Sequence, residues 1–412
     1  MNIKSIVVFS LAFLWMGQSH AENSARDSSN IATNAANSKI FYFTDRAPIS
    51  TEKGKLSYGA ERSWSLAFGE TNLSVDGQGN ELVSDANEIT RFPKTPYNVM
   101  KRSGGITRDP ATLTRHAQSI SLIHKALEAQ IASTRTKEVI LYVHGVNNSF
   151  DDAGMSASKI CNDLGANDFT CISFSWPAGA AKGAFFGYGF DRESGEFAIT
   201  DLKKSIRFIA GARGLKNIHL IAHSRGADIL SSAVQQLNGE TYAVKKSFME
   251  EYKIGELILA APDIDIDIAI GKFAATISDP DIPRVGGIDY QAIYNPSRIH
   301  ITVYSNAGDT ALDMSRSISG SSTRVGLVDA RSSSDGLALL EQLKDVVDLI
   351  SVDQASPDLF GHDYFLSSPN VRGDIVSLIR DKKFAGHTGR EIQEIKRPFW
   401  TLPAQAYQAN LK

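Results

Sequence analysis

Ser224 lies in a short segment whose residue types are typical of a serine nucleophile. The apolar run 218–222 has the length of a buried strand, and the residues from Ala227 onward have helical composition. A serine at such a strand-to-helix turn is typical of a nucleophile elbow, where the positions two before and two after the serine must be small. Ala222 and Gly226 fill these positions, with alanine where glycine is usual. This geometry would project the Ser224 hydroxyl above the sheet.

Two backbone N–H groups are candidates for binding the negative charge that develops on a carbonyl oxygen under attack. The N–H of Arg225 would stand at the start of the helix, where it has no intrahelical partner. A second apolar strand, 139–143, ends in His144-Gly145, and the loop after this strand supplies the other donor in acyl-transfer sites. Val146 is the predicted donor, and we interpret His144 as a structural residue of the loop.

Several short stretches of the chain together resemble a known family. The matching stretches are Ile40-Phe41-Tyr42-Phe43-Thr44-Asp45-Arg46, Leu56-Ser57-Tyr58-Gly59, Tyr142-Val143-His144-Gly145-Val146-Asn147, Asp191-Arg192-Glu193-Ser194, His223-Ser224-Arg225-Gly226, Leu259-Ala260-Ala261-Pro262-Asp263 and Gly361-His362-Asp363-Tyr364-Phe365. They resemble an uncharacterised bacterial α/β-hydrolase family, a domain-of-unknown-function family related to serine esterases and lipases. The resemblance implies an α/β-hydrolase fold with catalytic residues in the order serine, acid, histidine, each on a loop at the carboxyl end of a strand. It implies no substrate.

This order requires a histidine far downstream of Ser224. Of the nine histidines, most lie in the N-terminal segment, on an upstream helix, inside strands or in the loop described above. His223 is excluded because it must point away from the nucleophile. His362 directly follows the last predicted strand, and we predict that it is the general base and then the general acid. His387 remains the alternative.

Asp309 is the predicted acid, because it follows the strand 298–305 at the position where this fold places the carboxylate. It would hold the tautomer of His362 and stabilise the imidazolium. Asp263 follows the preceding strand and is the alternative acid, although the same Ala-Pro-Asp sequence could instead cap a helix. The remaining candidates for the acid are Asp313 and Asp353.

Helix and strand patterns alternate through the middle of the chain, which predicts an α/β fold with a mostly parallel central sheet flanked by helices. The predicted strands are 39–44, 56–59, 63–69, 139–143, 169–176, 218–222, 255–261, 298–305 and 346–352. The predicted helices are 114–133, 150–164 and 193–210, besides the one after Ser224. Residues 75–108 are predicted as a surface excursion. The aromatic segment 178–190 is either a lid-like insertion or a loop packed on its own side chains.

The first 21 residues are predicted to be a signal peptide. Lys4 supplies the positive charge, 5–17 an apolar core too short to span a bilayer, and Ser19-His20-Ala21 a cleavage site. An uncleaved anchor is the alternative. The predicted organisation is a signal peptide (1–21), a disordered leader (22–38) and an α/β-hydrolase domain (39–412), divided into N-terminal strands and excursion (39–135), catalytic core (136–380) and C-terminal tail (381–412).

Composition limits the partners. The 412 residues include 43 basic and 46 acidic ones, a net charge of −3 that gives no electrostatic case for nucleic acid. No spacing of His, Cys or Glu is typical of a metal site, and no cofactor is expected. Cys161 and Cys171 would form a disulfide in an oxidising compartment or remain two buried thiols.

The expected function is that of a serine hydrolase exported to the periplasm or the extracellular space, with no transmembrane span after signal cleavage. Small-molecule or lipid carboxylic esters are the expected substrates, cleaved through an acyl-enzyme intermediate. The same triad would serve a thioesterase, an amidase or a peptidase. A non-catalytic binding or envelope module on this scaffold is the alternative of a different class.

Overall fold

The computed structural model describes residues 39–51, 54–75, 81–83, 86–165, 167–179, 184–244, 246–275, 300–320, 323–332, 344–352 and 360–404. The predicted signal peptide and leader lie outside these residues, as does Asp353. Within these ranges, no helix combines the length and the apolar character needed to cross a membrane.

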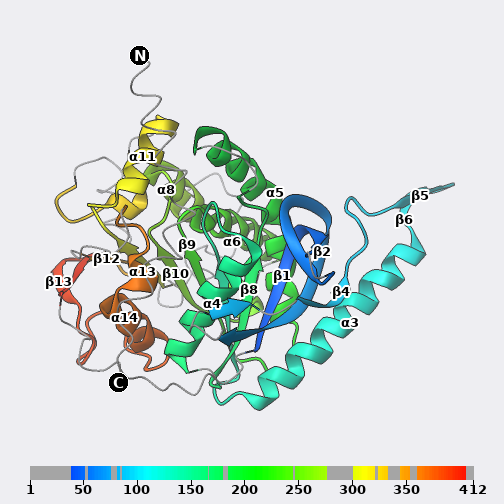
Figure 1. Cartoon of the computed structure of the whole chain (residues 1–412), viewed down its shortest axis with the longest axis horizontal. Helices are drawn as coiled ribbons and strands as arrows, with labels where there is room; N and C mark the ends of the chain where they lie inside the picture. The colour runs from blue at the N-terminus through cyan, green and yellow to red at the C-terminus, as the bar shows by residue number, and fades with distance from the viewer. Residues whose placement is uncertain are drawn as a thin grey trace.

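A twelve-stranded sheet runs through the described part of the chain, in the order β13-β14-β12-β11-β10-β9-β7-β8-β1-β2-β3, with β4 also paired to β2 (Figure 1). The strands from β14 to β1 in this order are parallel. They are β1 (Lys39–Ser50), β7 (Glu138–Val143), β8 (Phe169–Ser175), β9 (Ile218–His223), β10 (Ile254–Ala260), β11 (Ile301–Ser305), β12 (Val347–Val352) and β14 (Phe399–Leu402). The antiparallel strands are β2 (Leu56–Val75), β3 (Glu81–Val83), β4 (Asn87–Arg91) and β13 (Gln393–Lys396).

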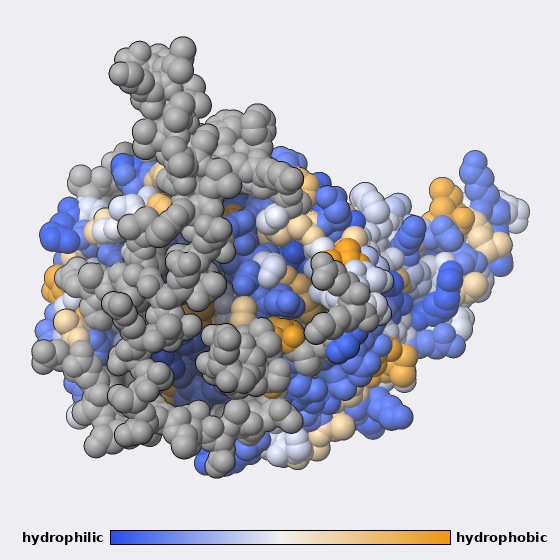
Figure 2. All heavy atoms as spheres, viewed as in Figure 1, coloured by the Kyte–Doolittle hydropathy of each residue, from blue (hydrophilic) through white to orange (hydrophobic). Residues whose placement is uncertain are grey.

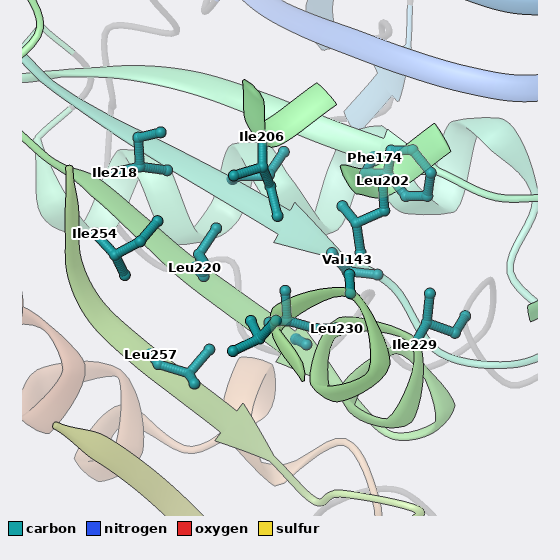
Figure 3. Close-up of a cluster of buried hydrophobic side chains, with 14 of the residues drawn as sticks. Val143, Phe174, Leu202, Ile206, Ile218, Leu220, Ile229, Leu230, Ile254 and Leu257 are labelled. Carbon is teal, nitrogen blue, oxygen red and sulfur yellow. The ribbon is translucent and has the colours of Figure 1, made fainter. Parts of the chain in front are cut away.

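Helices cover both faces of this sheet. They are α3 (Pro110–Ser133), α4 (Phe150–Leu164), α5 (Ala184–Ala210), α6 (Arg225–Ala243), α7 (Phe248–Glu251), α8 (Ile266–Ile270), η1 (Gly271–Ala275), α11 (Thr310–Ser319), η3 (Val325–Leu327), α13 (Tyr364–Ser367) and α14 (Pro369–Ile379). On one face, Val143 packs with Leu202 of α5 and Leu230 of α6 (Figure 3). On the other face, Tyr142 belongs to a core formed with α4 and α14. Because both faces are covered, every residue of β7, β8, β9, β11 and β12 is buried.

The order of β7, β8 and β9 in the sheet determines where the loops that carry the candidate catalytic residues lie. β7 lies between β8, the next strand along the chain, and β9. β7 is followed by α4 on one face of the sheet and β9 by α6 on the other face, so the loops at the carboxyl ends of these two strands run to opposite faces. The elbow follows β9 at this edge, and the loop containing Val146 follows β7.

The structure differs from the predicted elements in several places. β1 continues to Ser50, although the strand was predicted to end at Thr44, because its pairing with β2 extends that far. β2 is a single strand where two were predicted, because its pairing with β1 continues through register shifts around Arg46. The excursion 75–108 contains the short strands β3, β4, β5 (Val99–Arg102) and β6 (Gly105–Arg108). The segment 178–190 is helical from Ala184, where α5 begins, and residues 180–183 lie outside the described ranges. β13 and β14 were not predicted, because each has only four residues.

Cys161 and Cys171 form a disulfide with a Cα–Cα distance of 6.3 Å. It joins the last turn of α4 to β8, so the loop between them closes next to the sheet. The sequence left open whether these cysteines form a disulfide or remain two buried thiols, and the structure contains the disulfide.

Glu256 is buried near the amino end of β10. Its Oε2 has no hydrogen-bond partner among the described residues. Burial raises the pKa of Glu256 to about 7, although the nearby charges of His300, Lys382 and Arg390 act in the opposite direction. Because the raised pKa favours the protonated form in the folded protein, the carboxylate destabilises the fold progressively as pH rises from about 4.5 to 7.

Replacing Glu256 with glutamine is therefore expected to stabilise the protein at high pH. The gain in the free energy of unfolding should be small near pH 4.5 and reach on the order of 3 kcal/mol above pH 7. Urea unfolding at several pH values would measure it. Glu193→Gln, at an exposed position on α5, is the matched control. An equal gain at acid and alkaline pH would contradict the assignment of the effect to ionisation.

Candidate active site

Ser224 occupies the turn between β9 and α6 in a left-handed backbone conformation, with φ of 52°. This region is uncommon for residues other than glycine and is often kept at functional sites. Two hydrogen bonds to the neighbouring strand and its loop hold it. The Ser224 N–H donates to the Ala260 carbonyl at 3.0 Å, and the Asp263 N–H donates to the Ser224 carbonyl at 3.0 Å. The turn thus has the geometry that the sequence predicted for an elbow.

Close backbone contacts explain the glycines around the turn. A Cβ on Gly226 would lie 2.3 Å from the His144 carbonyl oxygen, so no side chain fits there. A Cβ on Gly145 would lie 2.9 Å from Ser224 Cβ and 3.4 Å from Ser224 Oγ. The loop after β7 therefore lies directly against the Ser224 side chain.

His144 fixes the start of this loop. Its ring stacks on Trp176, with centroids 5.0 Å apart. Nδ1 donates to the Gly145 carbonyl at 2.7 Å, and Nε2 accepts the backbone N–H of Trp176 at 3.0 Å. Burial, reinforced by the charge of Arg46, lowers the pKa of His144 to about 3, so the ring is neutral. Both nitrogens are engaged, which agrees with a structural role.

Arg46 fixes the far end of the same loop. Its guanidinium is buried and donates to the carbonyls of Asn148 at 2.6 Å and of Ala178 at 3.1 Å. One guanidinium therefore ties the loop after β7 to the loop after β8. Such multiple donation is suited to the planar fork of arginine. In the sequence, Arg46 was named only as the last residue of one of the stretches that resemble the family.

Asp191 of α5 is a further residue that sequence reasoning did not assign to the site. Its carboxylate accepts the N–H of Asn147 at 2.7 Å and the N–H of Gly179 at 2.8 Å. Asn147 has a φ of 56°, so the loop turns sharply at this point. Among the described residues, the N–H of Val146 has no hydrogen-bond acceptor, which leaves it available to a ligand.

Asp191→Asn is expected to lower the kcat of any acyl-transfer reaction at this site by about 10- to 100-fold. An amide cannot accept two N–H groups with two carboxylate oxygens, so the loop with Val146 would shift. The KM for a short ester should change little, because the substrate contacts remain. Steady-state kinetics would measure both constants, and Glu193→Gln on the same helix is the control. A parental kcat in the folded variant would contradict a positioning role.

Asp309 and His362 come together although 53 positions separate them. Asp309 is buried, and its Oδ2 accepts the hydrogen of His362 Nδ1 at 2.6 Å. Its Oδ1 accepts the N–H of Leu312 at 3.0 Å and so caps α11. The Thr310 N–H donates to the Phe360 carbonyl at 2.9 Å, which ties the two loops together. The carboxylate therefore favours the tautomer of the ring that carries a proton on Nδ1.

His362 lies beside the elbow. Its ring packs against that of His223, the residue before Ser224, with centroids 4.7 Å apart. His223 Nε2 lies 3.4 Å from the His362 carbonyl oxygen, and its ring stacks on Phe365. Burial lowers the pKa of His223 well below the usual value, so the ring stays neutral. His223 was excluded as the catalytic histidine from the sequence, and in the structure it is the packing partner of His362.

The alternative candidates lie in other surroundings. Asp263, the alternative acid or helix cap of the sequence analysis, is buried and accepts the hydroxyls of Tyr188 at 2.9 Å and Ser315 at 2.6 Å. It also pairs with Arg324 at 3.1 Å.

His387 is exposed, and its Nδ1 donates to its neighbour's carbonyl. Asp313 is exposed and pairs with an arginine one turn along α11. The capping role belongs to Asp265, at the start of α8.

A mostly parallel sheet covered by helices on both faces, with a serine on a strained strand-to-helix turn, defines an α/β-hydrolase fold. The chain belongs to the family described as "Alpha/beta hydrolase of unknown function (DUF900)", whose model matches residues 121–382. This match confirms the resemblance and the fold class inferred from the sequence. Within the described residues, no group of three or more His, Cys, Asp or Glu side chains is placed to hold a metal ion.

Solved structures are similar to this chain only at low identity. Est1E from Butyrivibrio proteoclasticus has 12% sequence identity, over 60% of this chain and 88% of that chain, with a TM-score of 0.28. A lipase/esterase from Lactobacillus plantarum has 13% identity, over 50% of this chain and 85% of that chain, with a TM-score of 0.24. Scores this low carry no argument about function. No curated protein matches the chain.

Proposed function

We propose that this protein is an exported serine hydrolase that cleaves carboxylic esters through an acyl-enzyme intermediate. Ser224 is the nucleophile, His362 the general base and acid, and Asp309 the carboxylate that orients the histidine. The observation that carries the proposal is the pair of His362 and Asp309, packed through His223 against the turn that bears Ser224. Three segments far apart in the sequence supply these groups.

The proposed reaction uses these three side chains in turn. His362 Nε2 takes the proton of the Ser224 hydroxyl as Oγ attacks the ester carbonyl, and the imidazolium is stabilised by Asp309. The imidazolium then gives this proton to the departing alkoxide, which leaves as the alcohol. Water, deprotonated by the same histidine, hydrolyses the acyl-enzyme and releases the acid.

The N–H groups of Val146 and Arg225 are proposed to bind the oxyanion. Val146 follows Gly145, whose backbone lies against Ser224, and its N–H is free of acceptors among the described residues. Arg225 is the first residue of α6, where the N–H has no intrahelical partner. Two fixed donors beside the nucleophile favour charge that develops only in the transition state.

Two observations support export. Residues 1–21 have the charge, apolar core and small-residue cleavage site of a signal peptide. The disulfide between Cys161 and Cys171 is of the kind that persists in oxidising compartments. A protein that stayed in the bacterial cytosol would keep both thiols reduced.

Covalent labelling tests the proposal most directly. The purified protein is expected to react with a fluorophosphonate probe at Ser224 and to hydrolyse p-nitrophenyl esters, and a series of graded acyl length would define the preferred chain. Peptide mass mapping identifies the labelled residue. If the folded protein neither reacts with the probe nor turns over any ester of the series, a non-catalytic binding module on the hydrolase scaffold becomes the better description.

A further inference from the structure

A two-stranded hairpin projects from the body of the protein. It consists of β5 (Val99–Arg102) and β6 (Gly105–Arg108), which pair only with each other and form a sheet separate from the main one. Every residue of both strands is exposed. Figure 1 shows the hairpin extending beyond the amino end of α3, away from the main sheet. We call the hairpin and the first turn of α3 the arm, residues 99–115.

The arm and its flanks are strongly basic in a chain of net charge −3. Residues 92–127 contain six cationic side chains, Lys94, Lys101, Arg102, Arg108, Arg115 and Lys125. The one acidic residue in that range is Asp109, whose carboxylate is occupied as the cap of α3 by the N–H and hydroxyl of Thr112. The segment therefore carries an excess of positive charge in a chain whose net charge is negative.

Large apolar side chains are exposed among these cations. Val99 is 59%, Ile106 68% and Met100 40% exposed, and Leu113 on the first turn of α3 is 44% exposed. In the hairpin register, Val99 stands opposite Arg108 and Ile106 opposite Lys101. Each of these cross-strand pairs thus combines an apolar group with a cation. Figure 2 shows hydrophobic and hydrophilic residues side by side on this projection.

We propose that the arm docks on the surface of an anionic phospholipid bilayer. Such a surface offers phosphate and acidic headgroups to the cations and, just beneath them, acyl chains to the apolar side chains. Four-residue strands extend about 13 Å. Peripheral segments bury their apolar face about 5–10 Å into the boundary between headgroups and acyl chains, so the hairpin is long enough to reach that depth. A nucleic acid would use the cations but would leave the aliphatic side chains in water. The bilayer is the partner that accounts for both kinds of side chain.

Vesicle cosedimentation tests this proposal, with phosphatidylcholine vesicles compared with vesicles containing about 30% phosphatidylglycerol. The parent protein is expected to bind the anionic vesicles and to release them at high salt. The triple change Lys101→Gln, Arg102→Gln, Arg108→Gln should weaken partitioning about 100-fold, at roughly 1 kcal/mol per cation. The pair Met100→Ser, Ile106→Ser should weaken it as well. All variants share the same N-terminal segment, so differences between them report on the arm alone.

The matched control removes the same charge elsewhere, through Lys216→Gln, Lys246→Gln and Lys396→Gln at exposed positions. It should bind as the parent does. Equal binding by the arm variants and the parent would overturn the proposal, as would equal binding to neutral and anionic vesicles. Binding to an oligonucleotide with no binding to vesicles would also overturn it and assign the arm to nucleic acid. Far-UV circular dichroism of each variant verifies the fold.

Discussion

Ser224→Ala is expected to lower kcat for ester hydrolysis by about 10⁵- to 10⁶-fold and to abolish labelling by a fluorophosphonate. Loss of the nucleophile removes the acyl-enzyme route, and only the oxyanion donors and substrate binding remain to assist attack by water. The free energy of unfolding should change little, because alanine keeps the Cβ and the backbone hydrogen bonds of the turn. Steady-state kinetics and urea unfolding on the same preparation measure both quantities.

Ser231→Ala is the matched control for this change. Ser231 is buried on α6, and its hydroxyl donates to the Ala227 carbonyl at 2.6 Å. Loss of this hydroxyl leaves the turn itself intact, so the control should turn over substrate at the parental rate and be labelled normally. Parental ester hydrolysis by Ser224→Ala would contradict the assignment of the nucleophile, whatever the behaviour of the control.

Asp309→Asn is expected to lower kcat by about 10⁴-fold while the protein remains folded. The asparagine oxygen can still accept the N–H of Leu312, and α11 keeps its cap. The amide that then faces His362 is a donor, so it favours the wrong tautomer of the ring and no longer stabilises the imidazolium. The KM should change much less than kcat, because the carboxylate is proposed to act on the histidine and not on the substrate.

Asp263→Asn separates the two candidate acids, because its expected effect falls on stability. The Asp263 carboxylate pairs with buried Arg324 and accepts two hydroxyls, so its loss leaves a buried guanidinium without its counter-charge. The expected cost is on the order of 3 kcal/mol of unfolding free energy, with kcat near the parental value. If Asp263→Asn abolished turnover in the folded protein and Asp309→Asn did not, the roles assigned to the two carboxylates would be reversed.

The main elements of the fold could be predicted from local sequence because their patterns are strong. The apolar runs that became β7, β9, β10 and β12 are buried on both faces, and α4 has the bounds that were predicted, 150–164. β13 and β14 were missed because each has only four residues and is held by strand pairing, β14 with β12 and β13 with β14, at the edge of the sheet. The double strand predicted at β2 was wrong because pairing with β1 overrides the polar residues at its centre.

Some residues of the candidate site could likewise be predicted from local sequence, and others could not. Ser224, Val146 and Arg225 could be predicted because short motifs determine the turn and the loop that bear them, within a few residues of chain. Asp191 could not, since what makes it important is the meeting of α5 with the loops after β7 and β8. The packing of His223 on His362 was likewise invisible, because 139 positions separate the two residues.

The sequence by itself determined the class of protein, the candidate nucleophile and the set of acids and histidines from which its partners could come. Only the tertiary structure placed Asp309 against His362 and enclosed Asp263 with Tyr188 and Arg324. Both aspartates follow neighbouring parallel strands, so either one could have been the acid. What separates them is which side chains from distant segments reach each carboxylate, and the packing of the folded chain decides that.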